Sequence, residues 1–175
     1  MVDVSSDAEL VRRFQHGDLA AFDALVQRFQ DRIYRLALVW LYDPQYAQDA
    51  CQEVFLRALK GLKGFRFRSA PFTWLYRATR NVCQEFNRKR PTEPLDEEPV
   101  DPTISADQHL DGEQAARWVR ALVAQLPPRQ REVVVLRLFE DLSVGETAHA
   151  MGCRPGTVKA LLHKAMHKLK EAGHE

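Results

Sequence analysis

The segment between residues 57 and 90 combines positive charge with flat aromatic side chains. It contains ten Lys or Arg residues and only one acid, Glu85, and Phe72, Trp74 and Tyr76 lie close together within it. A single nucleic-acid strand requires cations for its phosphates and planar apolar surfaces for its unstacked bases. These residue types predict binding of a single nucleic-acid strand. The alternative is a solvated basic face with Trp74 tucked under a neighbouring loop.

The element that must position these side chains is a helix. Pro71 suits a first helical position, and the helical period continues to about Asn87. One face is apolar and is expected to pack inward; it contains Phe72, Leu75, Thr79, Val82 and Phe86. The other face is polar and basic, with Trp74 at its edge; it contains Arg77, Arg80, Asn81, Gln84 and Arg88.

A second candidate site lies near the carboxyl end of the chain. Ser143 and Glu146 form an S-x-x-E capping box, Gly152 can end that helix, and Pro155 fits the first turn of the next one. Two helices separated by so short a turn predict a helix-turn-helix, whose second helix enters the major groove of DNA by its N-terminal end. The residues expected to reach phosphates or base edges there are Arg154, Thr157, Lys159 and His163.

Metal binding and catalysis are the competing kinds of chemistry. His163 and His167 are four residues apart on one predicted helix, with Cys153 and His149 nearby in sequence. Such ligands can bind zinc, nickel or copper, so a metal-responsive regulator is an alternative, but His is also a good phosphate donor and we predict no metal site. The sequence contains no glycine-rich phosphate loop, no H-E-x-x-H and no nucleophile beside a base. We therefore expect no catalytic residue, no cofactor and no enzyme activity.

Helical periodicity also runs through the rest of the chain, and strand signals are nearly absent. Helices are expected at about 7–14, 19–41, 45–59, 114–124 and 129–139. Residues 91–113 contain four prolines and eight acids, with too few large apolar groups to offset the entropy of ordering them. The sequence thus predicts an all-α protein with two small helical domains, 1–90 and 113–175. A flexible acidic linker at 91–112 joins them, and the second domain contains the helix-turn-helix.

Composition and charge fit a protein that acts inside the cell. The chain is 45% hydrophobic with a net charge of +1, but residues 1–90 carry fifteen basic and ten acidic groups, and the tail after residue 113 carries ten and six. No apolar run approaches the roughly eighteen residues of a membrane span, so no membrane insertion is expected. The N-terminus lacks the features of a signal peptide. Cys51, Cys83 and Cys153, odd in number and widely spaced, favour a reducing cytoplasm over a disulfide framework.

The order of these parts resembles the extracytoplasmic-function (ECF) sigma factors of bacterial RNA polymerase, in the sigma-70 family. The first half contains GDLAAFDALVQRF, DACQEVFLRAL, TWLYRATRN and RKR, and the second contains LPPRQREVVVLR, LSVGETAHAMGC and GTVKALLHKA. The resemblance covers almost the whole chain, with several motifs in the right order. It implies an alternative sigma factor that binds the clamp and flap of core RNA polymerase and directs promoter-specific initiation. It also implies an anti-sigma factor, which in this family is often membrane-bound. A stand-alone helix-turn-helix regulator is the alternative, but it leaves the basic aromatic helix without a role.

The resemblance assigns residues to three contacts. The helix that docks on the polymerase clamp would use Asp49, Gln52, Glu53, Val54 and Phe55. The part that opens the minus-ten element and holds a flipped base would use Phe65, Arg66, Ser69, Phe72, Trp74, Tyr76, Arg77, Arg80, Asn81 and Arg88. The reader of the minus-thirty-five element would use Arg154, Pro155, Gly156, Thr157, Lys159 and His163.

The sequence departs from the family pattern in each of these contacts. Tyr46 and Gln48 stand where acidic residues are common, so the clamp contact is expected to be less acidic than usual. The loop FRFRSAP, residues 65–71, replaces a pattern that usually carries Gly and an acid, which bears on the base preference at the minus-ten element. Leu161 stands where the recognition helix often has Arg, so one expected phosphate contact is missing.

Overall fold

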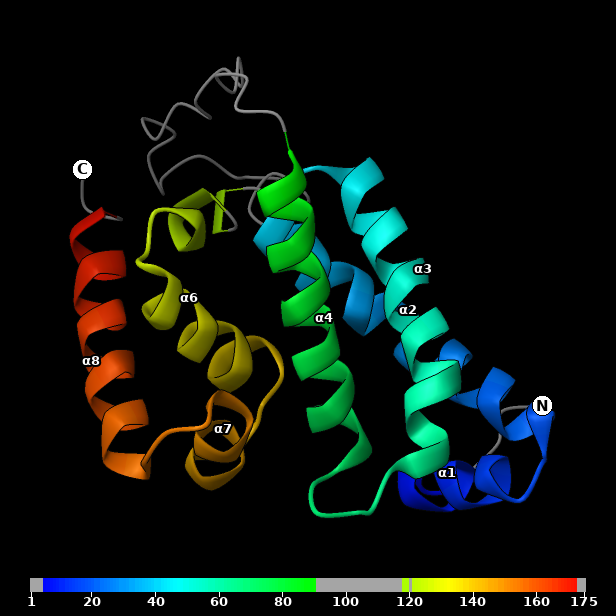
Figure 1. Cartoon of the computed structure of the whole chain (residues 1–175). Helices are drawn as coiled ribbons and strands as arrows, with labels where there is room; N and C mark the ends of the chain where they lie inside the picture. Colours follow the sequence, from blue (N-terminus) through cyan, green and yellow to red (C-terminus); the bar gives the residue numbers. More distant parts are fainter. Residues whose placement is uncertain (1–4, 91–117, 120, 173–175) are drawn as a thin grey trace. The chain divides into compact units, whose positions relative to one another are not determined.

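The computed structural model describes residues 5–90, 118, 119 and 121–172, and these residues form helices and turns without a strand (Figure 1). The chain divides into two units, Met1–Pro91 and Thr92–Glu175. The predicted all-α class is therefore confirmed. The predicted linker at 91–112 and the first residues of the helix expected from residue 114 lie outside the described residues. None of the described helices is long and apolar enough to cross a membrane.

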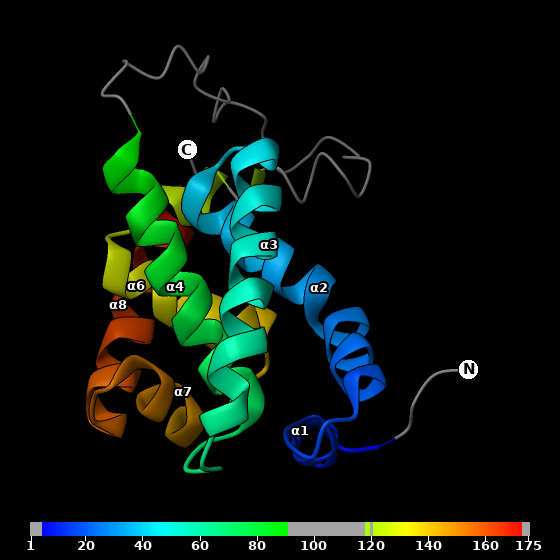
Figure 2. The ribbon, with the colours of Figure 1, turned by 45° about the vertical axis from the view of Figure 1, so that its right-hand side comes forward.

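The first unit contains four α-helices: α1 (Asp7–Gln15), α2 (Leu19–Leu41), α3 (Pro44–Gly61) and α4 (Pro71–Lys89). A short 3-10 turn, η1 (Leu62–Gly64), follows α3. The side chains of Ser6, Asp18 and Asp43 accept hydrogen bonds from first-turn N–H groups of α1, α2 and α3, which is why these helices begin where they do. Figures 1 and 2 show α1 lying across the end of the bundle at which α3 ends and α4 begins.

The core of the first unit forms where the apolar stripes of these helices meet. Leu25, Phe29 and Ile33 of α2 are at most 2% exposed, and they pack with buried side chains of α3 and α4 such as Val54 and Leu75. Each such burial contributes about 1.5–3 kcal/mol relative to an exposed side chain. The buried face of α4 is narrower than the sequence indicates, because Phe86, which the helical period places on its inward side, is only half-buried. The apolar side chains of Phe22 and Val26 in α2 are half-buried as well.

The second unit contains a helix that includes residues 121–124, then α6 (Pro128–Val134), α7 (Val144–Met151) and α8 (Pro155–Ala172). The helix expected at 129–139 changes character halfway, because Val135–Phe139 (η2) forms a wider π-helical turn. Val133 and Leu136 from this segment are fully buried, as are Val158 and Ala165 of α8. These residues form the small core that fixes α7 and α8 relative to each other.

Two arginines of α6 make polar contacts that stabilise the second unit. The guanidinium of Arg131 donates hydrogen bonds to the carbonyls of Val123, Ala124 and Leu126, at distances of 2.5–3.3 Å. These carbonyls lie at and just after the end of the preceding helix, where the regular i+4 backbone donors are missing. Arg129 Nη1 lies 2.8 Å from the buried carboxylate of Glu132. The charge of Arg129 compensates the charge of Glu132, which would otherwise be costly to bury.

Candidate polymerase and nucleic-acid interfaces

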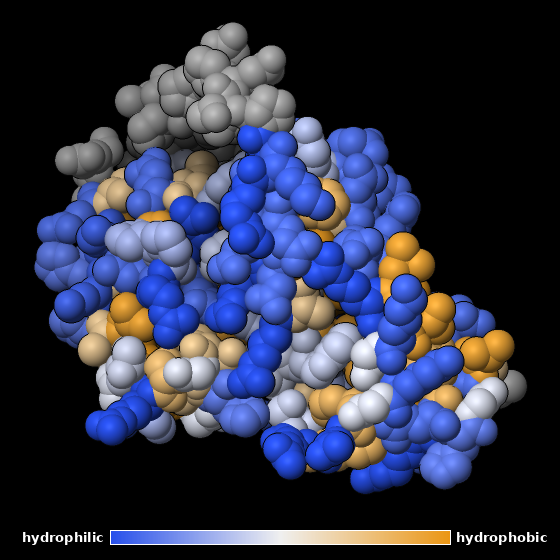
Figure 3. Space-filling model, viewed as in Figure 1, coloured by the Kyte–Doolittle hydropathy of each residue, from blue (hydrophilic) through white to orange (hydrophobic). Residues whose placement is uncertain are grey.

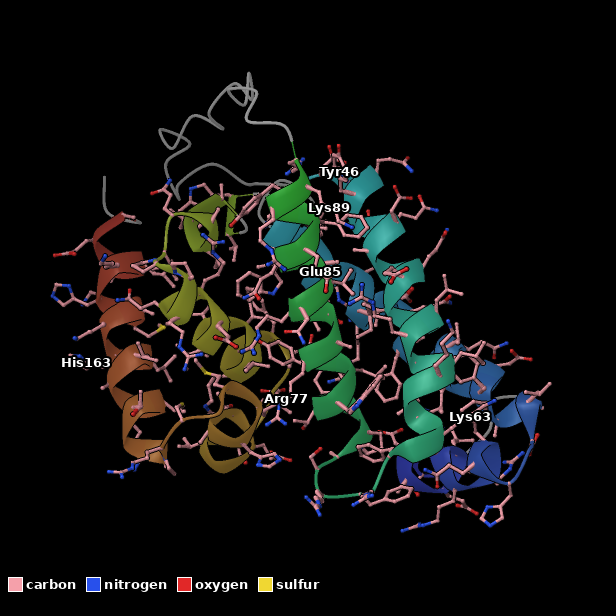
Figure 4. All side chains as sticks on the ribbon, in the orientation of Figure 1. Tyr46, Lys63, Arg77, Glu85, Lys89 and His163 are labelled. Atoms are coloured by element: carbon pink, nitrogen blue, oxygen red, sulfur yellow. The ribbon has the colours of Figure 1, made fainter. Side chains whose placement is uncertain are left out.

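The polar face of α4 carries the predicted cations, and its one acidic side chain is bound by an arginine of α3. Asn81 and Arg88 are exposed, and Arg77 and Arg80 are half-buried. The only acid of this segment, Glu85, is bound by Arg57 of α3, whose Nη1 and Nη2 lie 2.9 and 2.7 Å from the two carboxylate oxygens. The hydrogen bonds from Arg57 hold the pKa of Glu85 below its usual value. The surface over α4 is accordingly hydrophilic (Figure 3), and Arg77, Glu85 and Lys89 are spaced along it (Figure 4).

Two of the predicted minus-ten residues belong to the core rather than to this surface. Tyr76 is fully buried, and Phe72 is 5% exposed. The ring of Phe72 stacks on Phe29 with centroids 5.8 Å apart, and the guanidinium of Arg32 lies 3.7 Å from its centroid. Positions 72, 76 and 79 fall on one side of a helix, and here that side faces α2. We therefore leave Phe72 and Tyr76 out of the contact surface.

Trp74 lies at the edge of this surface and is held by a glycine. Its side chain is half-buried, and it packs against Gly61 at the end of α3. A Cβ atom added at Gly61 would lie 2.4 Å from Cζ2 of the indole, closer than any real contact. The absence of a side chain at Gly61 thus allows the indole to approach the end of α3 closely. The end of a helix thus lies against Trp74, whereas the alternative interpretation of the sequence placed a loop over it.

In the loop before α4, the aromatic side chains are partly buried and the basic side chains are exposed. Phe65 and Phe67 are half-buried and contact each other edge to face, with centroids 5.0 Å apart. Arg66 and Arg68, which alternate with them, are exposed, and Ser69 is half-buried. Phe67 has a φ of 54°, in the left-handed region that bulky residues rarely adopt. The loop therefore presents two arginines to solvent beside the polar face of α4.

Sequence analysis did not find the residues of α1 that contact this loop. Gln15 Nε2 donates hydrogen bonds to the carbonyls of Leu62 and Phe65, both at 2.9 Å. The guanidinium of Arg12 lies 4.7 Å from the ring centroid of Phe67. These partners are about fifty residues apart along the chain, so no local pattern indicates them.

The predicted clamp contact on α3 is only partly available at the surface. Asp49 and Gln52 are exposed, Phe55 is half-buried, and Glu53 is half-buried with a carboxylate oxygen 2.7 Å from Arg57. Val54 is fully buried within its own unit, so we leave it out of the contact surface. The reason is the helical period, which turns position 54 toward α2 and α4, between Ala50 and Ala58 of the buried stripe.

A groove between α2 and α3 extends this surface. Its volume is about 560 Å³, and Gln52 and Phe55 form part of its lining. The half-buried Phe22 and Val26 of α2 also line it, together with Leu56, whose exposed fraction is 60%. Leu56 is an apolar residue on the otherwise polar side of α3, and its position in the sequence is the signal that could have predicted this groove.

The helix-turn-helix has the predicted caps. Ser143 Oγ accepts a hydrogen bond from the N–H of Glu146, and a Glu146 carboxylate oxygen accepts one from the N–H of Ser143, at 3.2 and 2.8 Å. Hydrogen bonding of the Glu146 carboxyl to Ser143, first through the Ser143 side chain and then through its backbone, lowers the pKa of Glu146. Gly152 ends α7 with a φ of 63°, and α8 begins at Pro155. All of the predicted contact residues are exposed, namely Arg154, Pro155, Gly156, Thr157, Lys159 and His163.

The candidate metal ligands do not form a site in the described part of the chain. No group of three or more His, Cys, Asp or Glu side chains there is placed to hold a metal ion. His163 and His167 are exposed on α8, and Nδ1 of His167 lies 3.2 Å from a carboxylate oxygen of Glu171. Nothing in this geometry favours a metal-responsive regulator. Cys83 is buried in the first unit, and burial raises the pKa of its thiol to about 12, so it remains protonated.

Comparison with known families gives matches in both units. The family described as Sigma-70 region 2 matches residues 25–91, and the family described as Sigma-70, region 4 matches residues 116–169. The RNA polymerase sigma-H factor of Pseudomonas aeruginosa is 33% identical over 98% of this chain and 96% of that protein. The ECF RNA polymerase sigma factor SigM of Mycobacterium tuberculosis is 36% identical over 94% of this chain and 83% of that protein.

Solved structures show the same fold. CnrH, solved in complex with the cytosolic domain of CnrY, matches with a TM-score of 0.74 over 95% of this chain and 96% of that chain, at 21% identity. The sigma factor RpoE of Bartonella quintana, solved with the anti-sigma factor NepR, matches with a TM-score of 0.68 over 86% of this chain and 95% of that chain, at 22% identity.

Proposed function

This chain belongs to the ECF sigma factors of the sigma-70 family and is an alternative sigma factor that directs transcription initiation, and we propose which of its surfaces carry that function. The polar face of α4 and the loop at residues 65–70 bind the non-template strand of the minus-ten element. The observation that carries this proposal is the engagement of Glu85 by Arg57. It removes the only acid from a face that otherwise attracts phosphates.

The residues of α4 and of the loop before it suit three requirements of strand opening: binding phosphates, contacting a base edge and stacking on an unstacked base. Arg66, Arg68 and Arg88 are exposed cations that can neutralise phosphates. Asn81 is an exposed amide that can donate to and accept from a base edge. The indole of Trp74 offers a partly exposed flat surface, and stacking on it, worth about 1–3 kcal/mol per base, offsets the roughly equal cost of unstacking a flipped base.

The N-terminal end of α8 reads the minus-thirty-five element in the major groove. Arg154 and Lys159 contact phosphates, and Thr157 contacts a phosphate or a base edge. Pro155 and Gly156 allow the first turn of α8 to approach the DNA backbone closely, since neither carries a long side chain. With Leu161 where the recognition helix often has Arg, this interface depends on fewer phosphate contacts than is usual in the family.

The exposed part of α3 and the adjoining groove bind the clamp of core RNA polymerase, and the second unit binds the flap. Asp49, Gln52 and Phe55 are the side chains that α3 presents for this purpose. The apolar groove also suits an anti-sigma factor, such as those in complex with the structural relatives. The chain catalyses nothing itself and acts in the cytoplasm, where the polymerase performs the chemistry. A stand-alone helix-turn-helix regulator is not favoured, because the family matches include region 2.

Replacing Asn81 by Ala tests the assignment of the α4 face. We expect open-complex formation to fall about tenfold, since one or two hydrogen bonds to a base are lost, while affinity for core polymerase is unchanged. Permanganate footprinting measures the open complex, and fluorescence anisotropy measures core binding. The promoter is one recovered by transcription of a randomised promoter library with the purified holoenzyme.

The matched control is Gln27→Ala, which removes an exposed amide from α2 and should change neither measurement. Equal losses of core binding and open complex in Asn81→Ala would mean that Asn81 is structural. An unchanged open complex would mean that the α4 face does not contact the strand at this position.

A further inference from the structure

Helix α1 lies outside residues 25–91, the part that the region 2 family matches, yet it contacts the loop before α4. We propose that α1 is the positioning element of this loop and that Gln15 and Arg12 thereby set the base preference at the minus-ten element. This inference rests on the proposed function of the loop. It assigns a specificity role to a helix of only nine residues.

The amide of Gln15 fixes the start of the loop. Its Nε2 donates both of its hydrogen bonds to backbone carbonyls, one to Leu62 in η1 and one to Phe65, at 2.9 Å each. Phe65 is the first residue after η1, so this bridge sets the direction in which the chain leaves the turn. A primary amide has two N–H donors, and both are used here. Among side chains of this length, only Gln can bridge two carbonyls from its uncharged end.

Arg12 holds the middle of the loop. Its guanidinium lies 4.7 Å from the ring centroid of Phe67, and the edge-to-face contact with Phe65 covers the ring from another side. Phe67 has a φ of 54°, a conformation that a bulky side chain keeps only where its surroundings determine it. These contacts are what stabilises it. With the rings of Phe65 and Phe67 held by α1 and by each other, Arg66 and Arg68 remain exposed.

This arrangement affects specificity more than general affinity. A loop that is already ordered loses little entropy on binding, and its donors occupy fixed positions relative to the strand. A base whose edge fits those positions is then favoured over the others. Once the loop is released from α1, its arginines still attract phosphates of any sequence, but they no longer discriminate between bases. If the contacts with α1 are removed, we therefore expect the protein to lose its preference among bases while it still binds DNA of any sequence through its arginines.

Gln15→Glu is the first test, because it keeps the side-chain length and replaces the two N–H donors with oxygens. Gln27→Glu on α2 introduces the same charge at an exposed position away from the loop. Holoenzymes made with each variant and purified bacterial core polymerase transcribe a pooled library randomised across the minus-ten element, and the transcripts are sequenced. We expect the preference for the favoured base at one or more positions to fall about tenfold in Gln15→Glu and to be unchanged in Gln27→Glu.

Two further measurements separate positioning from folding. Core affinity of Gln15→Glu should match that of Gln27→Glu, and its thermal unfolding should remain a single cooperative transition for the first unit; a loss of core affinity would mean that Gln15 is only structural and would overturn the inference. Arg12→Ala changes an exposed side chain and should also reduce base preference. If Arg12→Ala instead weakens binding equally for all sequences and lowers its salt dependence, Arg12 is a phosphate contact, which overturns its positioning role.

The double variant Arg66→Ala, Arg68→Ala separates this inference from the proposed function. We expect it to reduce open-complex formation on every member of the library. If it has no effect, the loop does not contact the strand and the proposed function of the loop fails. If it has the expected effect while Gln15→Glu and Arg12→Ala keep the original base preference, the proposed function stands and the positioning role of α1 is refuted.

Discussion

The two proposed DNA-binding surfaces are built in different ways. At the helix-turn-helix, the contact residues lie on one helix end, and the features that place them are adjacent in sequence: a capping box, a left-handed Gly152 and Pro155. At α4, the contact residues are placed by partners from two other helices, α3 and α1. Arg57 of α3 binds Glu85, Gly61 packs under Trp74, and α1 contacts the loop.

This difference suits the two forms of DNA. Duplex DNA has a regular groove, so a rigid helix end that is fixed locally is sufficient to read it. A displaced strand has no fixed shape, and the protein must supply the geometry to which its bases conform. More tertiary contacts are therefore required at the minus-ten surface. It follows that substitutions remote in sequence should damage the surface on α4, whereas the surface on α8 should respond mainly to changes in its own caps.

The largest effect is expected from Gly61→Ala. The new Cβ would lie 2.4 Å from the indole of Trp74, so either the ring or the end of α3 must move. Overpacking of this kind costs about 1–3 kcal/mol, which exceeds the gain of at most about 1 kcal/mol from replacing a helical glycine. The free energy of unfolding of the first unit should fall by that difference, as measured by urea denaturation followed by tryptophan fluorescence. Open-complex formation should fall with it.

Gly64→Ala is the matched control, because a Cβ there meets nothing within 4 Å. It lies three residues away at the end of η1 and should leave both quantities nearly unchanged. Equal stability of the two variants would show that the indole moves aside freely, and the minus-ten surface would then be less dependent on remote contacts than we infer.

A smaller and more local effect is expected from Ser143→Ala in the second unit. It removes the hydroxyl that accepts a hydrogen bond from the N–H of Glu146, and loss of an N-cap costs about 1 kcal/mol. The urea midpoint of the second unit, followed by circular dichroism, should fall, while that of the first unit stays constant. Ser143→Asp preserves an N-cap acceptor and should restore most of the loss. A change in the first unit would contradict the independence of the two surfaces.

The contrast between the surfaces also explains what could be predicted from sequence. The ends of α1, α2, α7 and α8 were predicted closely, because Ser6, Asp18 and the caps of the helix-turn-helix act within one turn. The exposed residues of α8 were likewise confirmed as exposed. The resemblance to a family indicated where the minus-ten surface lies, but two of the residues that it assigned to this surface are buried. Tyr76 and Phe72 were assigned to it by the resemblance and are part of the core, as the helical period had already indicated for Phe72.

The errors and omissions have a common physical cause. Whether an aromatic side chain is buried depends on which helix covers that side of α4, and helix packing is not a local property. The contacts from Gln15 and from Arg57 to Glu85 join residues 28 to 50 positions apart, and a single sequence contains no signal for such pairs. The π-helical turn at Val135–Phe139 was missed for a similar reason, since its apolar spacing is compatible with an ordinary α-helix.

The smallest effect is expected when the pH is lowered. This experiment again compares the locally capped surface of the second unit with the α4 surface of the first unit. The hydrogen bonds from Ser143 hold the pKa of Glu146 below its ordinary value of 4.5 in the folded state. The unfolded chain therefore binds this proton more readily, so the stabilisation is present above about pH 4.5 and is lost as pH falls through the lowered folded value. Because Glu146 is exposed, solvent screening keeps the effect below that of Ser143→Ala.

Glu146→Gln isolates this contribution, since glutamine preserves the capping box but does not titrate. In this variant the urea midpoint of the second unit should depend less on pH between about 6 and 3.5, and the first unit should be unaffected. Glu85→Gln is the counterpart in the first unit, where the pKa is lowered by Arg57 of another helix. It should flatten the acid response of the first unit only, but it also breaks a contact between α3 and α4, so it should lower open-complex formation at neutral pH. If Glu85→Gln were as mild at neutral pH as Glu146→Gln, the ion pair would not help to position the minus-ten surface.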